Sequence, residues 1–143
     1  MSAVAPYLDD ARVLDLFAGS GALGLEALSR GAASATFVDD SAAALRVLTQ
    51  NVATLGAGDR VTVVKADAIH WADALGRDAF DVVFADPPYG KGLAARLAER
   101  FAAVPFAGLL CIEHGRGDVL PELPGSRTRR YGDSHLTFIP APS

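Results

Sequence analysis

The 143-residue sequence predicts an α/β fold: a mostly parallel seven-stranded sheet with helices on both faces and a C-terminal antiparallel hairpin. Short apolar runs alternate five times with segments of helical periodicity, which is the pattern of strand–helix–strand units. Near the C-terminus, two further runs are joined by Gly132-Asp133-Ser134, which favours a hairpin. No linker is long enough to divide the chain, so residues 1–143 are expected to form a single domain.

The first strand, turn and helix follow an irregular lead-in. Residues 13–17 are apolar except for Asp15, which is typical of a short buried strand. Gly19 and Gly21 then allow a tight turn without side chains, and a helix is expected over residues 22–30. This arrangement points free backbone N–H groups and a helix N-terminus at a ligand above the turn. A nucleotide-like molecule is the usual occupant of such a site.

The other elements follow from the same alternation of apolar runs and helical periodicity. Asp39-Asp40-Ser41 supply the N-cap of the second helix, and Pro87 and Pro88 end the fourth strand abruptly. Strands are expected at 35–38, 61–64, 80–85 and 108–113, helices at 41–55, 69–75 and 93–103, and hairpin strands at 127–131 and 135–139.

The net charge of −4 gives the whole molecule no attraction for nucleic acid. The charge is uneven, because residues 1–86 carry a net −6 and residues 87–143 a net +2. Any nucleic-acid partner must therefore meet a local basic patch. Arg127, Arg129 and Arg130 alternate along the expected hairpin with one member out of phase. A solvated edge strand is the first interpretation of these arginines, and phosphate contact is the alternative.

Several classes of protein are excluded by what the sequence lacks. No apolar run approaches the roughly 20 residues of a membrane span, and the N-terminus does not resemble a signal peptide. Cys111, the single cysteine, lies in an apolar run and is expected to be a buried, inert thiol. His114 and His135 lack metal-ligand partners at suitable spacing, so no metal site is expected. These features predict a cytoplasmic protein with no membrane partner.

Four acidic residues each close a successive predicted strand. They are Asp15, Asp39, Asp67 and Asp86. Because the carboxyl ends of parallel strands meet at one edge of a sheet, all four should stand along the edge where such folds bind ligands. Acids that only serve solubility would be scattered without respect to strand ends.

The nature of the ligand follows from the residues around the glycine turn. Gly19, Gly21 and Gly24 spell GxGxxG, and Asp39 lies at the distance typical of a dinucleotide site. However, Asp15 precedes the turn, and a carboxylate there repels a pyrophosphate and suits a cation. S-adenosylmethionine carries a sulfonium, an ammonium and a ribose diol but no phosphate, so it is the predicted cofactor. The alternative interpretation of Asp15 is a solvated loop acid.

The tetrapeptide Asp86-Pro87-Pro88-Tyr89 is suited to holding a planar amine. The residue before a proline is held extended, so the Asp86 carboxylate should project from the strand end. The Pro87 carbonyl is a second acceptor, since Pro88 has no N–H to compete for it. Together they can accept both hydrogens of an exocyclic –NH₂ and direct its lone pair at an electrophilic methyl, while Tyr89 stacks on the base.

In the glycine turn and the tetrapeptide 86–89, the sequence resembles the 16S ribosomal RNA guanine-N2 methyltransferases, which are class I S-adenosylmethionine-dependent methyltransferases. The resemblance extends from about Leu8 to Thr137 and is strongest over residues 15–32, DLFAGSGALGLEALSRGA. Asn51 to Leu55 and Glu113 also match. The glycine turn is common to most class I methyltransferases, whereas the acid-Pro-Pro-aromatic motif narrows the resemblance to amino-group methylation.

The resemblance implies a Rossmann-like class I methyltransferase that acts on 16S ribosomal RNA or a small-subunit assembly particle, with a monomer favoured. Asp39 would accept hydrogen bonds from the ribose hydroxyls, where the family usually has Glu, and Asp67 with the Ala68 amide would face the adenine. The target guanine would be drawn out of its stack. The implied cofactor-binding residues are Asp15, Phe17, Ala18, Gly19, Gly21, Asp39, Asp40, Asp67 and Ala68, and the implied catalytic residues are Asp86, Pro87, Pro88 and Tyr89.

The sequence departs from the family at its N-terminus. Members usually carry an upstream segment with an Arg-Pro-Thr motif and an Arg-Glu…Phe-Asn helix, whereas this sequence begins shortly before the first strand. A misassigned start or a truncated member would explain the difference, which bears on RNA binding more than on cofactor binding. Adenine-N6 methylation of DNA or RNA is the alternative activity. A truncated cofactor-binding module with little activity and an NAD-binding domain are the alternatives outside this class.

Overall fold

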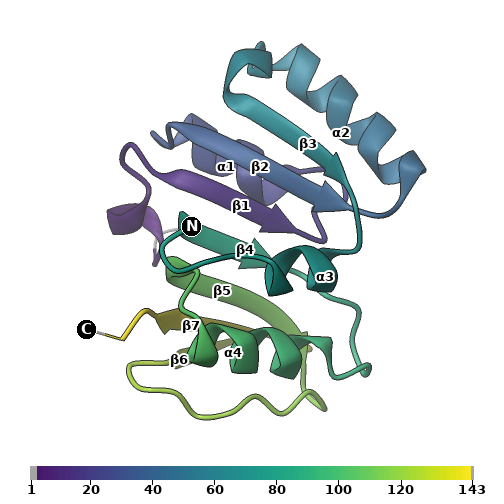
Figure 1. Cartoon of the computed structure of the whole chain (residues 1–143). Helices are drawn as coiled ribbons and strands as arrows, with labels where there is room; N and C mark the ends of the chain where they lie inside the picture. Colours follow the sequence, from purple (N-terminus) through teal and green to yellow (C-terminus); the bar gives the residue numbers. More distant parts are fainter. Residues whose placement is uncertain (1–2, 143) are drawn as a thin grey trace.

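Seven strands form one sheet in the order β3-β2-β1-β4-β5-β7-β6 in the computed structural model, which describes residues 3–142 (Figure 1). Strands β1 to β5 are parallel to one another, whereas β7 pairs antiparallel with β5 and β6. The predicted parallel sheet with a C-terminal hairpin is confirmed. The elements are η1 (Ala5–Tyr7), β1 (Arg12–Leu16), α1 (Ala22–Ser29), β2 (Ser34–Asp39), α2 (Ala42–Thr54), η2 (Gly58–Arg60), β3 (Val61–Lys65), α3 (Ala68–Asp73), β4 (Phe80–Ala85), α4 (Leu93–Ala103), β5 (Ala107–Gly115), β6 (Arg127–Tyr131) and β7 (Ser134–Pro140).

The central strands are buried on both faces because their alternate side chains enter two separate cores. Val13 of β1 lies in the core with α1 and α2, whereas its neighbours Leu14 and Leu16 lie in the core with α3 and α4. In Figure 1, α3 and α4 cover the near face of the sheet and α1 lies behind it. No helix within residues 3–142 is long and apolar enough to span a membrane.

Two helices begin at side-chain caps that the sequence supplies. The Ser41 hydroxyl accepts a 3.1 Å hydrogen bond from the amide of Ala44 at the start of α2, as predicted. The Asp67 carboxylate accepts a 2.9 Å hydrogen bond from the amide of His70 in α3. Caps of this kind each stabilise a helix by about 1 kcal/mol. They fix the first turns of both helices beside the carboxyl ends of β2 and β3.

The structure differs from the sequence prediction mainly at the ends of elements. Strand β5 continues to Gly115, two residues past its predicted end, because β7 pairs with it from Leu109 to Gly115. Strand β1 ends at Leu16, since Phe17 has a φ of 58° and starts the glycine turn. The lead-in contains one short 3-10 turn, η1, which the composition did not indicate.

The β6–β7 hairpin is tighter than predicted and brings its tip to the carboxyl edge of the parallel strands. Only Gly132 and Asp133 separate the two strands, with Gly132 at a φ of 58°. Tyr131 and Ser134 are paired at the tip, and Ser134 is also paired with Gly115 at the end of β5. The hairpin therefore lies beside the ligand-binding edge of the sheet.

Candidate active site

A cleft of about 560 Å³ opens at the carboxyl ends of β1, β2, β4 and β5. This edge is where parallel α/β sheets bind ligands. Seven of its lining residues were predicted from the sequence, whereas Glu113 was not among the predicted site residues. The lining residues are Phe17, Asp39, Asp40, Asp86, Pro87, Pro88, Tyr89 and Glu113.

The glycine turn between β1 and α1 needs backbone conformations that only small residues adopt readily. Gly19 and Gly21 have φ values of 55° and 82°, in the left-handed region that favours glycine. A Cβ on Gly21 would also clash with the Leu48 side chain on α2. The turn therefore packs closely against α2 and leaves no room for a side chain at Gly21, in agreement with the predicted turn without side chains.

Asp39 ties the glycine turn to the start of α2. One carboxylate oxygen accepts a hydrogen bond from the Gly19 amide at 2.9 Å, and the other accepts one from the Ser41 amide at 2.9 Å. Each carboxylate oxygen has a further lone pair, so both remain able to accept hydroxyl groups from the cleft. Asp39 thus has a structural role beside its predicted role toward a ribose.

Asp15 lies beneath the glycine turn and is only 2% exposed. Its carboxylate accepts a 3.0 Å hydrogen bond from the Gly24 amide in the first turn of α1. Burial raises the pKa of Asp15 to about 7, although the Gly24 hydrogen bond opposes the shift. The side chain is not among the residues that line the cleft. Asp15 therefore supports the glycine turn from below and is not the solvated loop acid of the alternative interpretation.

The tetrapeptide 86–89 stands at the mouth of the cleft, directly after β4. The amide of Asp86 donates to the Leu16 carbonyl at 3.4 Å, which joins the end of β4 to the end of β1. Pro87 is buried, whereas Tyr89 is 49% exposed. The Tyr89 ring lies against Gly115, where an added Cβ would come within 3.0 Å of the ring. One face of β5 thus supports the aromatic ring.

Asp118 holds this tetrapeptide loop against the end of β5. Its two carboxylate oxygens accept hydrogen bonds from the amides of Gly90, at 3.0 Å, and Gly115, at 3.1 Å. Gly90 directly follows Tyr89, so the bridge fixes the position of that ring. The sequence prediction missed Asp118, because the pairing between residues 28 positions apart leaves no local signal.

Glu113 and Asp86 form a pair of carboxyls in the cleft. The two residues come from neighbouring parallel strands, since Ala85 is in register with Ile112. Partial burial and the Glu113 carboxyl together raise the pKa of Asp86 to about 6. Glu113 follows the same strand-end pattern as the four predicted acids, and that pattern was the available signal for it.

Some predicted residues lie outside the cleft. Asp67 stands near the end of β3, but its carboxylate caps α3, and Ala68 is the buried first residue of that helix. Ala18, Gly19 and Gly21 form the turn beside the cleft without being counted among its lining residues. Of the four acids predicted along this edge, Asp39 and Asp86 line the cleft, whereas Asp15 and Asp67 do not.

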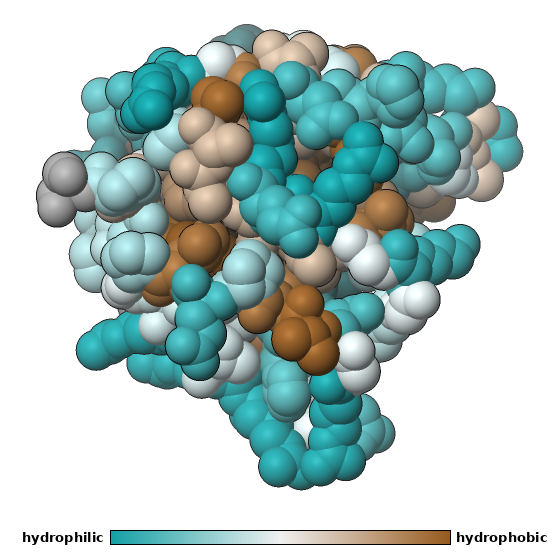
Figure 2. All heavy atoms as spheres, turned by 60° about the horizontal axis from the view of Figure 1, so that its bottom comes forward, coloured by the Kyte–Doolittle hydropathy of each residue, from teal (hydrophilic) through white to brown (hydrophobic). Residues whose placement is uncertain are grey.

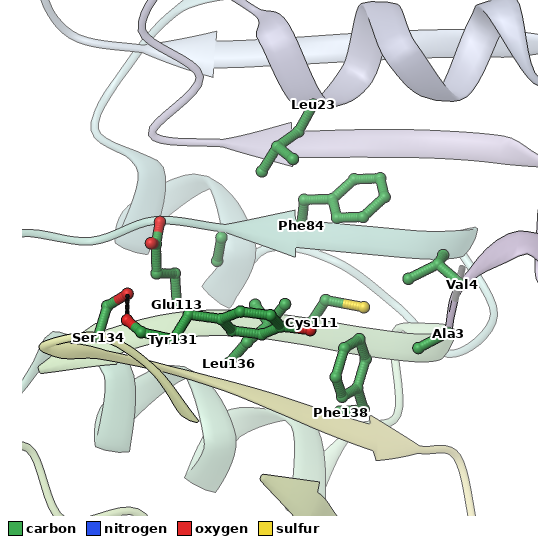
Figure 3. Close-up of a pocket in the computed structure, with 11 residues that line it drawn as sticks. Ala3, Val4, Leu23, Phe84, Cys111, Glu113, Tyr131, Ser134, Leu136 and Phe138 are labelled. Carbon is green, nitrogen blue, oxygen red and sulfur yellow. Dashed lines mark hydrogen bonds between the residues drawn. The ribbon is translucent and has the colours of Figure 1, made fainter. Parts of the chain in front are cut away.

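An apolar pocket of about 180 Å³ adjoins the cleft and shares Glu113 with it (Figure 3). Phe84, Cys111 and Tyr131 are among its lining side chains. Cys111 is 2% exposed, and burial raises the pKa of its thiol to about 12. The predicted inert thiol is consistent with this environment.

The chemistry of the cleft suits S-adenosylmethionine better than a phosphate-bearing cofactor. Its charged lining side chains are all acidic, namely Asp39, Asp40, Asp86 and Glu113, and no Lys or Arg lines it. Carboxylates attract a sulfonium and an ammonium and accept hydrogen bonds from ribose hydroxyls, whereas they repel a pyrophosphate. Within residues 3–142, no three His, Cys, Asp or Glu side chains are placed so that they could hold a metal ion together.

Comparisons with known proteins identify the family of this chain and support its fold. Residues 1–140 match the family described as conserved hypothetical protein 95. Over 126 residues, the chain is 40% identical to ribosomal RNA small subunit methyltransferase D of Escherichia coli K12, covering 86% of this chain and 63% of that protein. It therefore spans less than two thirds of the length of that relative.

Solved structures show the same architecture. A conserved hypothetical protein of Streptococcus pyogenes superimposes with a TM-score of 0.82 at 34% identity, covering 96% of this chain and 89% of the other. A SAM-dependent methyltransferase of Agrobacterium tumefaciens, at 15% identity, shares the fold with a TM-score of 0.70 over 99% of this chain and 60% of its own. The chain therefore belongs to the conserved hypothetical protein 95 family, and the resemblance to ribosomal RNA methyltransferases predicted from its sequence is confirmed.

Proposed function

We propose that this chain methylates the exocyclic N2 amine of a guanine in 16S ribosomal RNA, with S-adenosylmethionine as the methyl donor. The observation that carries the proposal is the placement of Asp86, Pro87 and Tyr89 in one cleft with the acids Asp39 and Asp40. The name of the Escherichia coli relative, a small-subunit ribosomal RNA methyltransferase, supports the class of substrate.

The cofactor would occupy the cleft between the glycine turn and the end of β2. When bound, it supplies an electrophilic methyl group on its sulfonium. Asp39 and Asp40 would accept hydrogen bonds from the ribose hydroxyls, and the turn amides around Gly19 would contact the methionyl end. Asp15 would hold the turn in place through the Gly24 amide.

The tetrapeptide would hold the target amine. The Asp86 carboxylate and the Pro87 carbonyl would each accept one N–H, which leaves the nitrogen lone pair directed into the cleft. Tyr89 would stack on the base after it is drawn out of the RNA. The product amine must lose a proton, and the Asp86 carboxylate, whose pKa is raised to about 6, is placed to accept it.

Glu113 favours guanine over adenine as the target. Guanine presents two adjacent kinds of donor, N1–H and the N2 amine, whereas adenine presents an acceptor at N1 beside its N6 amine. A second carboxylate next to Asp86 can accept the N1–H of guanine but repels the N1 lone pair of adenine. The alternative of adenine-N6 methylation fits this acidic pair less well.

The decisive test is to locate the methyl group in the product. The chain is incubated with isotopically labelled S-adenosylmethionine and 16S ribosomal RNA, and the digested nucleosides are identified by mass spectrometry. We expect labelled N2-methylguanosine, and Asp86→Ala should abolish it while leaving calorimetric cofactor binding nearly unchanged. Labelled N6-methyladenosine would favour the alternative, and cofactor binding without labelled RNA would identify a module with little activity.

A further inference from the structure

Strand β6 presents a row of cationic and aromatic side chains on one face of the sheet. Arg127, Arg129 and Tyr131 are paired with Phe138, Leu136 and Ser134 of β7, respectively. Because side chains on paired strands share a face, the three lie on the same side as the apolar pocket of Figure 3, which Tyr131, Leu136 and Phe138 line. We call Arg127, Arg129 and Tyr131 the β6 stripe.

The charges of the β6 stripe are available to a partner. All five residues of β6 are exposed. Within residues 3–142, the ion pairs involve Arg12, Arg30 and Arg96, and none involves an arginine of β6. Figure 2, turned to bring this end of the sheet forward, shows hydrophilic residues beside apolar groups.

The β6 stripe leads to the mouth of the candidate active site. Strand β6 runs toward the hairpin tip, where the Ser134 hydroxyl donates to the Tyr131 carbonyl at 3.1 Å. Ser134 is also paired with Gly115 of β5, and the ring of Tyr89, from the tetrapeptide at the cleft, lies against Gly115. A strand of RNA that places a base against Tyr89 must therefore pass close to Tyr131 and the arginines behind it.

We propose that the β6 stripe binds the RNA strand next to the target base, with Arg127 and Arg129 on successive phosphates and Tyr131 stacked on a neighbouring base. This proposal rests on the proposed function. Side chains two residues apart on a strand are separated by about 6.6 Å, which lets them follow an extended backbone. Arginine binds phosphate through two parallel N–H groups, and aromatic rings stack on any base.

The charge distribution of the chain makes this surface the favoured route of approach. Residues 1–86 carry a net −6, so the half of the sheet that includes β1, β2 and β3 repels a polyanion. Residues 87–143 carry a net +2, and three of their seven cationic side chains are the arginines of β6. An acidic protein could also form ion pairs with these arginines, but it has no bases on which Tyr131 could stack.

The test compares two double variants that remove the same charge. R127Q/R129Q changes the β6 stripe, and R60Q/R77Q changes two exposed arginines outside it, which precede β3 and β4. Binding of a fluorescent single-stranded RNA fragment of the 16S sequence is measured by anisotropy across a range of salt concentrations.

We expect R127Q/R129Q to weaken binding and to reduce the slope of log K against log salt by about 1.4, since each lost phosphate contact on a single strand contributes about 0.7. R60Q/R77Q should leave the slope unchanged. Tyr131→Ala should weaken RNA binding roughly 5- to 150-fold, whereas Tyr131→Phe should retain it. Cofactor affinity, measured by calorimetry, should be the same in all of these proteins.

The outcomes separate this proposal from the proposed function. If the parent methylates RNA but R127Q/R129Q keeps the parental slope, the β6 stripe does not bind RNA and the proposed function stands. If the slope falls as expected but no RNA is methylated, the binding surface stands and the proposed function fails. An equal loss in both double variants would overturn the proposal, because only net charge would then matter.

Discussion

The carboxyls of Asp86 and Glu113 lie together in the cleft, and their interaction sets the pH range in which Asp86 can hold an amine. A protonated Asp86 loses an acceptor, so only its ionised form can take an N–H of the target. Burial and the Glu113 carboxyl raise the pKa of Asp86 to about 6. The ionisation of Asp86, and with it the ability of the site to hold an amine, therefore depends on pH.

We expect methyl transfer to be lost as the pH falls through about 6, with kcat/KM declining tenfold for each further pH unit. Glu113→Gln removes the neighbouring negative charge, so the pKa of Asp86 should fall and the acidic limb should move to lower pH. A kcat/KM profile between pH 5 and 8 at constant ionic strength measures both effects. An unchanged limb in the variant would show that Glu113 does not act on Asp86.

Asp15 makes folding stability depend on pH in the opposite sense from most acids. Its pKa rises from 3.8 to about 7 on folding, so the folded chain binds more protons than the unfolded chain between these values. Its contribution is favourable below pH 3.8 and is lost as the pH rises through 7. At pH 8 the buried charge costs on the order of 4 kcal/mol.

Asp15→Asn should therefore be more stable than the parent at pH 8, while the difference should shrink toward pH 4. The amide oxygen of Asn can still accept from the Gly24 amide, so the turn should keep its shape. Urea unfolding at several pH values gives the difference in free energy. A variant that is less stable than the parent at every pH would contradict the buried-charge interpretation.

At the scale of elements, the site depends on loops that are fixed by single side chains. Asp118 joins the loop after β4 to the end of β5, and Asp39 joins the turn after β1 to the start of α2. Each carboxylate binds two backbone amides that would otherwise be free to move. The shape of the cleft therefore depends on Asp118, which does not line it, as well as on Asp39, which does.

We expect Asp118→Ala to lower kcat without weakening cofactor binding, because the bridge to the Gly90 amide positions Tyr89 and not the glycine turn. Loss of hydrogen bonds to a charged group costs about 1.5–3 kcal/mol, or roughly a 10- to 150-fold effect if all of it falls on the transition state. Asp118→Asn should recover part of the loss. Steady-state kinetics and calorimetry separate kcat from cofactor affinity, and a parallel loss of both would indicate general unfolding of this edge.

The sequence predicted elements well where local periodicity decides them. The bounds of β4 and α4 agree with the predicted ranges, because two prolines end the strand and a strong apolar face defines the helix. The extension of β5 to Gly115 could not be predicted, since it depends on pairing with a strand far along the chain. Asp118 was missed for the same reason, because its partner Gly90 is distant in sequence, whereas Glu113 could have been found from the strand-end pattern.

At the scale of the whole molecule, the proposed cofactor is expected to stabilise the entire fold, because in the cleft it would contact turns that follow several strands. Binding to the folded state alone, at a ligand concentration 100-fold above Kd, adds about 2.7 kcal/mol of stability. For a domain of this size that corresponds to a rise in Tm of about 9 °C. Thermal unfolding with S-adenosylmethionine should show this rise, whereas NAD should not; equal rises would contradict the argument from the acidic cleft.

The position of β6 has a consequence for how copies of this chain meet one another. It is the outermost strand of the sheet, so its outer row of backbone N–H and C=O groups lacks a strand partner among the described residues. An unpaired edge strand can hydrogen-bond to the edge strand of a second molecule, which leads to aggregation. Three arginines in five positions place like charges against any identical edge that approaches. The cations that would attract a polyanion thus also keep the sheet from extending into a neighbouring molecule.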